Sequence, residues 1–141
     1  MKRPSRSDLK DRDRGAAAVE FAICLPLLLL LVFGIIDFGR ALNAQLSLTQ
    51  AAREGVRLAA LGYSSAAVDA RANAAAPGLG GVTVTITDAC PPGAGPTDDA
   101  QVNVSYSFSF ITPVGSIAGL FGSGFGSPIT LSAQGVMPCE T

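Results

Sequence analysis

The chain has 141 residues and a formal net charge of −1, and it contains no histidine. Once the long apolar run near the amino terminus is set aside, the remaining length suffices for one small folded domain. The acids are scattered and no base is visible that could activate a serine or a cysteine, so neither an enzyme nor a cofactor site is expected. The only basic cluster is a short terminal tail, which gives no support for nucleic-acid binding.

Charge is divided unevenly along the sequence. Residues 1–15 carry six basic and three acidic side chains, whereas the part after Ile36 carries four basic and seven acidic ones. By the positive-inside rule, we expect the tail to stay cytoplasmic and the remainder to cross the membrane. The predicted domains are a cytoplasmic basic leader at 1–15, a transmembrane helix at 16–36 and a small extracytoplasmic α+β domain at 37–141.

The predicted membrane helix is apolar except for Glu20. At about 1.5 Å per residue, residues 16–36 span a hydrocarbon core of roughly 30 Å. A signal peptide removed at Ala44 is the alternative, but the apolar run is long for that role. Pro26 is compatible with a membrane helix, in which neighbours or local loosening satisfy the freed carbonyl group.

Two features at the start of this segment are not needed by an ordinary anchor. Gly15 followed by Ala16 offers a small-residue cut point before the span rather than after it. Glu20 places a carboxylate within hydrocarbon, at a cost of about 2.5–3.5 kcal/mol. Such an acid indicates a function and a partner.

The helical pattern continues beyond the membrane, because residues 37–61 contain no proline and their apolar side chains recur every three or four positions. One continuous helix from Ala16 to Leu61 would be roughly 69 Å long. Gly62 is the predicted stop. The apolar stripe consists of Phe38, Leu42, Leu48, Ala52, Val56 and Ala59.

The sequence also predicts an ion pair on this helix and a second helix after it. Glu54 lies three residues before Arg57, a spacing typical of a solvated ion pair. The alanine-rich residues 66–76 follow two serines and end at Pro77, which predicts a short second helix packed on the first helix or on a sheet.

After Gly81 apolar and polar residues alternate, as in strands with one apolar face. Three such segments are predicted, at 82–87, 102–110 and 129–134. Their apolar face needs a cover, and the two helices provide the large apolar surfaces available. The fold class is therefore α+β, with a roughly three-stranded antiparallel sheet on a long amino-terminal helix. The strand order stays open.

Two linkers separate these strands, at 88–100 and 112–128. Both are rich in glycine, and the first is also rich in proline. The second contains G-S-G-F-G, but it opens no helix and lacks the lysine of a phosphate loop. Its apolar residues are expected to fold under the sheet or face another subunit; they are Ile117, Leu120, Phe121 and Phe125.

The three cysteines have different expected fates. Cys24 lies in the span, where a thiol behaves as a small apolar group. Cys90 and Cys139 both lie outside the membrane in this topology, in an oxidising setting where pairing is usual. We predict a disulfide between them, contributing roughly 4 kcal/mol. The alternative is a metal pair, but two thiols without histidine are too few ligands for structural zinc.

Two stretches carry a family resemblance: G-A-A-A-V-E-F-A-I-C-L-P-L-L-L-L-L-V-F-G-I-I-D-F-G-R-A-L at 15–42 and Q-A-A-R-E-G-V-R-L-A-A at 50–60. They resemble the TadE-like family, the minor pilin-like proteins, or pseudopilins, of the bacterial tight-adherence (Flp pilus) machinery. The resemblance implies a pilin-like fold and cleavage after Gly15 by a membrane-embedded prepilin peptidase at the cytoplasmic face. Ala16 would become the new amino terminus and Glu20 its fifth residue, the acid of the pilin-like signature.

The sixth residue after this cut is Phe21, where the major Flp pilins have tyrosine, and the globular part is much larger than theirs. The resemblance therefore implies a minor subunit in pilus assembly or adhesion. Its implied partners are the prepilin peptidase, other pilin-like subunits, the assembly machinery and membrane lipid. It implies residence in the bacterial inner membrane with the amino terminus inside, and leaves entry into the fibre open.

The physical interpretation of Glu20 is independent of the family. Cutting after Gly15 frees an α-amino group that, on one subunit, can neutralise the buried acid of the next. The alternative is that Glu20 snorkels to the nearby interface. For the whole protein, the alternatives are an unprocessed signal-anchored envelope protein with a small partner- or ligand-binding domain, and a soluble exported domain that has lost the span.

Overall fold

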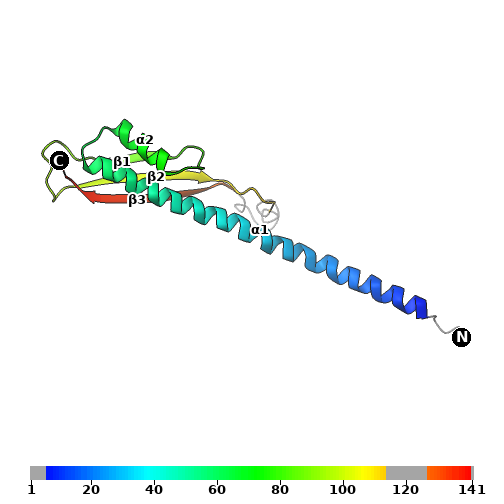
Figure 1. Cartoon of the computed structure of the whole chain (residues 1–141). Helices are drawn as coiled ribbons and strands as arrows, with labels where there is room; N and C mark the ends of the chain where they lie inside the picture. Colours follow the sequence, from blue (N-terminus) through cyan, green and yellow to red (C-terminus); the bar gives the residue numbers. More distant parts are fainter. Residues whose placement is uncertain (1–5, 114–126, 141) are drawn as a thin grey trace.

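A computed structural model describes residues 6–113 and 127–140. In these residues the chain forms a long helix with a short helix and a three-stranded sheet gathered around its carboxyl-terminal half (Figure 1). The amino-terminal half of the long helix projects alone. This confirms the predicted α+β architecture. The elements in chain order are α1 (Arg6–Ala60), α2 (Ser65–Ala75), β1 (Thr83–Asp88), β2 (Asp99–Phe108) and β3 (Ile129–Pro138).

α1 is 55 residues long and begins inside the basic leader, earlier than the predicted start at Ala16. No proline or glycine lies between its first residue and Gly15, so nothing in the leader interrupts the helix. The predicted stop at Gly62 is confirmed, with φ at 72°. The amides of Gly62 and Tyr63 donate to the carbonyls of Ala59 and Leu58, both at 3.1 Å. This is a Schellman motif, in which a left-handed glycine satisfies the last carbonyl groups.

The sheet is an antiparallel meander in the order β1-β2-β3. All three predicted strands are confirmed, with shifted ends. β3 continues past the predicted end at Gln134, because it pairs with β2 along its whole length, from Phe108↔Ile129 to Asp99↔Pro138. β2 starts earlier than predicted and ends at Phe108, so Phe110 lies beyond the strand.

One face of the sheet packs on α1, and α2 lies against α1 beside it (Figure 1). Gly55 marks the place where the three elements meet. A Cβ there would lie 3.4 Å from both Ala72 Cβ of α2 and Val102 Cγ1 of β2. Small residues on α1 thus let both neighbours approach closely. The fully buried core residues are Leu48, Ala51, Ala52, Val68, Ala72, Ala100, Val102 and Val104.

The predicted apolar stripe of α1 divides in two. Its upper part, from Leu48 to Ala59, is buried in the domain. Phe38 and Leu42 are instead 66% and 50% exposed. The sheet therefore covers only the distal part of the stripe, and the base of the domain keeps an exposed apolar surface.

The predicted solvated pair of Glu54 with Arg57 is wrong. Glu54 Oε2 accepts hydrogen bonds from Arg71 of α2, at 2.8 Å from Nη2 and 3.1 Å from Nε. Arg71 lies on α2, the neighbouring helix. The rule for pairs three or four residues apart on one helix therefore does not detect this contact. The expectations for Ile117, Leu120, Phe121 and Phe125 lie outside the described residues.

Candidate processing and assembly site

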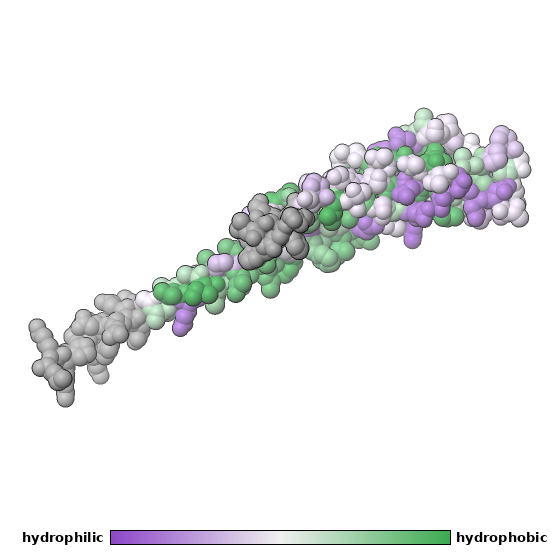
Figure 2. All heavy atoms as spheres, turned by 180° about the vertical axis from the view of Figure 1, so that it is seen from behind, coloured by the Kyte–Doolittle hydropathy of each residue, from purple (hydrophilic) through white to green (hydrophobic). Residues whose placement is uncertain are grey.

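The lower half of α1 is an isolated apolar rod. Every residue from Ala16 to Val32 is exposed. Figure 2 shows the apolar surface running along the rod and continuing to the base of the domain. Among the described residues, one helix is long and apolar enough to cross a membrane, and none of its most apolar stretch is buried. An apolar surface of this length is suited to contact with lipid or with other helices, because its exposure to water is unfavourable.

The residues predicted at the cut point lie within this rod. Gly15 and Ala16 are exposed and helical. A Cβ at Gly15 would meet nothing within 4 Å, so no packing contact in the described chain requires glycine there. In a helix interior glycine is about 0.8–1.0 kcal/mol less favourable than alanine. Gly15 is therefore a local weak point of α1 immediately before the apolar run.

Glu20 and Phe21 lie on the next turn and are both exposed. The ion pairs formed by the described residues are Asp37 with Arg40 and Glu54 with Arg71, and neither involves Glu20. Glu20 therefore has no cationic partner within the part of the chain that the structure describes. The domain lies too far along α1 to supply one.

A buried carboxylate directly after the apolar run was missed by the sequence analysis. Asp37, the first charged residue after the apolar run, is 3% exposed. It accepts hydrogen bonds from the Thr112 hydroxyl group, from the Ile111 amide at 3.4 Å and from Arg40 Nη1 at 3.2 Å. The Thr112 hydrogen bond leads these contacts in holding the pKa of Asp37 below its ordinary value, against the opposing effect of burial.

Arg40 extends this cluster to the end of β2. Its Nη1 atom lies 3.4 Å from the Ser109 carbonyl oxygen, and its guanidinium carbon lies 5.1 Å from the centroid of the Phe108 ring. We call Asp37, Arg40, Phe108 and Thr112 the juxtamembrane clamp. It fastens the end of β2 to α1 directly above the apolar run. The sequence shows only the Asp37–Arg40 spacing, because the other partners lie about 70 residues later.

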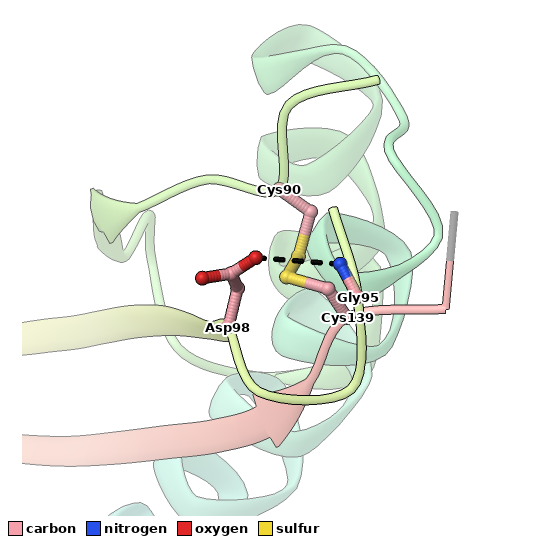
Figure 3. Close-up of a disulfide and its surroundings, with 4 residues drawn as sticks. All are labelled: Cys90, Gly95, Asp98 and Cys139. Atoms are coloured by element: carbon pink, nitrogen blue, oxygen red, sulfur yellow. Dashed lines mark hydrogen bonds between the residues drawn. A yellow bond between two sulfur atoms is a disulfide. The ribbon is translucent and has the colours of Figure 1, made fainter. Parts of the chain in front are cut away.

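The predicted disulfide between Cys90 and Cys139 is confirmed at the opposite end of the domain, with the Cα atoms 5.7 Å apart (Figure 3). The Cys139 amide donates to the Asp98 carbonyl at 2.8 Å, and the Glu140 amide donates to the Ala60 carbonyl at 3.0 Å. The chain end is therefore tied both to the loop after β1 and to the last turn of α1.

Cys24 is a free thiol exposed on the rod. Residues 6–113 and 127–140 contain no group of three histidine, cysteine or acidic side chains that could hold a metal ion. The structural features of the candidate site are thus an apolar rod, a helix weak point and one unpaired acid.

Comparison with known proteins gives one family match. The family described as TadE-like protein matches residues 15–57. This segment contains Gly15, Glu20 and the clamp residues Asp37 and Arg40. No curated protein and no solved structure matches the chain. Proteins of this family are structural, non-enzymatic and associated with the Tad pilus. Residues 15–57 of this chain are therefore TadE-like, as the resemblance implied.

Proposed function

We propose that this chain is a pilin-like minor subunit of a tight-adherence pilus, cut after Gly15 and active in pilus assembly or adhesion. One observation carries the proposal. The exposed apolar stretch of α1 at 16–36 bears a single acid, Glu20, which has no cationic partner in the described chain. The match to the TadE-like family over 15–57 supports the same conclusion.

Processing would use the weak point at Gly15. A peptidase needs access to the backbone, and a helical backbone hides its amides in intrahelical hydrogen bonds. Glycine lowers the cost of opening the helix locally and offers no side chain to obstruct a subsite. A cut there removes the basic leader and leaves Ala16 at the start of the membrane helix.

The cut also changes the electrostatics around Glu20. The new α-amino group adds a positive charge to the amino-terminal end of a helix, which already favours anions through its dipole. In a bundle of such helices, the amino group of one subunit can pair with Glu20 of its neighbour. Each group offsets the desolvation cost of the other, so the pair also fixes the register between subunits.

The membrane orientation follows from two parts of the chain. The leader carries an excess of basic residues, which favours a cytoplasmic amino terminus. The disulfide between Cys90 and Cys139 favours an oxidising compartment for the domain. We therefore place the leader in the cytoplasm and residues 37–141 outside the inner membrane.

A second candidate function is an uncut, signal-anchored envelope protein whose domain binds a partner. The observation that favours it is the continuity of α1 through Gly15, with no break between leader and span. The two candidates differ in the fate of the leader.

Replacing Gly15 by valine separates them. Gly15→Val should insert normally and stay at full length in the native host, because a branched side chain obstructs the backbone at the cut. Gly39→Val is the matched control, since Gly39 is also in α1 with open space around its Cα. It should be shortened like the wild type. Immunoblotting and intact mass of the membrane-extracted proteins give the readout. Equal shortening of both variants would contradict the proposed site.

A further inference from the structure

The two edges of the sheet are protected to different extents. β1 is short, its register with β2 is irregular between Ile86 and Asp88, and it ends in that acid. β3 is the other edge strand and lies beside α1 (Figure 1). It runs for 10 residues in unbroken register and contains no charged side chain. Short strands, irregular register and charges all discourage pairing at an edge, so β3 is the edge suited to accept a further strand.

The hydrogen bonds of β3 show which of its backbone groups point away from β2. The Cys139 amide donates to the Asp98 carbonyl, so these two residues form a hydrogen-bonded pair of the antiparallel ladder. Such pairs alternate with residues whose amide and carbonyl groups point outward. The Ser132 carbonyl agrees with this alternation, because it accepts a hydrogen bond from Gln45 of α1. The outward residues of β3 are therefore Thr130, Ser132, Gln134, Val136 and Pro138.

Gln134 and Val136 offer the outward groups nearest the upper half of α1. Both residues are exposed, and both line a groove between β3 and α1. Within the described chain, their outward amide and carbonyl groups form no hydrogen bond. Unpaired backbone groups at an edge are the template on which a strand of another chain can be added.

The wall of this groove on α1 carries uncompensated positive charge. It is formed by Arg53, Glu54, Val56 and Arg57. The Glu54 carboxylate is already paired with Arg71 of α2. Arg53 and Arg57 are exposed, and neither belongs to an ion pair formed by the described residues. Two cations beside open backbone groups favour an acidic partner.

The spacing of these cations suits an extended partner. Arg53 and Arg57 are separated by roughly 6 Å along the axis of α1. Alternate residues of a strand lie on one face, about 6.6 Å apart. Two acids separated by one residue would therefore face the two arginines together. After Gly15 this chain has no two acids with that spacing, so a second copy does not supply such a strand.

We infer that the β3 edge binds an extended acidic segment of another protein, which adds a fourth strand to the sheet beside β3. Backbone hydrogen bonds at Gln134 and Val136 would hold the segment, and Arg53 and Arg57 would select carboxylates at alternate positions. The inference concerns a contact of the domain and does not depend on cleavage after Gly15.

The test uses the probe peptide T-V-T-E-T-E-T-V-T, whose glutamates share one face when it is extended. Isotope-labelled full-length protein in detergent micelles is titrated with the peptide and followed by NMR. The amide signals of Gln134 and Val136 should move and reach saturation, because both amides gain a hydrogen bond. The signals of Val84 and Ile86 on β1, the opposite edge, are the internal control and should stay in place.

Two variants separate the backbone contact from the charge contact. Val136→Pro removes one outward amide, which does not donate to β2, and should weaken binding measured at Gln134 roughly ten-fold. Val136→Thr keeps the amide and is the matched control, with unchanged affinity. Arg53→Glu combined with Arg57→Glu should abolish binding. Circular dichroism checks the fold of each variant, and the charge-reversed variant remains a test if Val136→Pro does not fold.

A peptide with lysine in place of both glutamates should not bind the wild type. Three results would overturn the inference. They are the absence of shifts at Gln134 and Val136, equal affinities of the folded Val136→Pro and Val136→Thr variants, and binding that survives the charge reversal on α1.

Discussion

The two halves of α1 belong to one helix but have opposite surroundings. Between Ala16 and Ile36 the helix carries large apolar side chains, most of which are exposed. Above Leu42 the positions that face the sheet and α2 are mainly alanine, together with Leu48, Gly55 and Val56. Large side chains on the lower half suit a surface buried against lipid or other subunits, whereas small ones on the upper half let three elements of the same chain pack tightly. Under the proposed function, the lower half serves assembly, whereas the upper half folds the domain.

The largest effect is expected from Glu20, the single acid of the apolar stretch at 16–36. Glu20→Gln should abolish or severely reduce piliation in the native host, because the amide cannot form the charged contact with a neighbouring α-amino group. The thermal stability of the domain should stay unchanged, since Glu20 contacts no part of it. Fibre counts by electron microscopy and melting curves in detergent give the two readouts. Normal fibres from Glu20→Gln would contradict the proposed role of the lower half in assembly.

Next in size is the loss of the disulfide in the upper half. Cys90→Ser should lower the free energy of unfolding by about 4 kcal/mol, because the bridge closes a loop of nearly 50 residues. Cys24→Ser, which removes the exposed thiol on the rod, is the control and should leave stability unchanged. Denaturant titration of both variants measures the difference. An equal effect at the two cysteines would contradict the assignment of folding to the upper half.

Gly135 tests the close approach of β3 to α1. A Cβ at this position would lie 2.6 Å from the Ala52 carbonyl oxygen and 2.9 Å from Val56 Cγ1. Gly135→Ala should therefore destabilise the domain by about 1–3 kcal/mol through overpacking. Gly80→Ala is the control, because a Cβ there meets nothing within 4 Å. A melting temperature unaffected by Gly135→Ala would contradict the tight packing of β3 against α1.

The smallest effect is expected at the junction of the two halves. The pKa of Asp37 is lowered in the folded chain, chiefly by the Thr112 hydrogen bond. The stability that this carboxylate contributes is therefore present above its ordinary, unfolded pKa and is lost as the pH falls through the lower, folded pKa. Asp37→Asn should be less stable than the wild type at neutral pH, and the two should converge in acid. A constant difference from pH 7 to pH 2 would exclude titration of Asp37 as the cause.

Local sequence signals predicted much of the fold. The alternation of apolar and polar residues gave the three strands, and Gly62 marked the end of α1. The disulfide followed from the predicted topology, which places Cys90 and Cys139 together outside the membrane. The strands and the helix end depend on short-range patterns, and the disulfide depends on the predicted membrane topology. The sequence displays both kinds of signal directly.

The remaining contacts depend on residues that are distant in sequence. The burial of Asp37 needs Thr112, and the pairing of Glu54 needs Arg71 from another helix. Gly135 could have been noticed, because a glycine within a strand pattern indicates close approach of another backbone. Glu20 and Gly15 were singled out because an acid in an apolar run and a small-residue junction are both unusual in a membrane anchor, and their roles stay predictions.

The most direct test of the central claim is the intact mass and amino-terminal sequence of the protein extracted from membranes of its native host. The account predicts a chain that begins at Ala16, with Glu20 as its fifth residue. A mature chain that still begins at Met1 would contradict processing and leave an anchored domain. A chain that begins near Gln45 would mean that the apolar rod is a signal peptide and would contradict assembly through it.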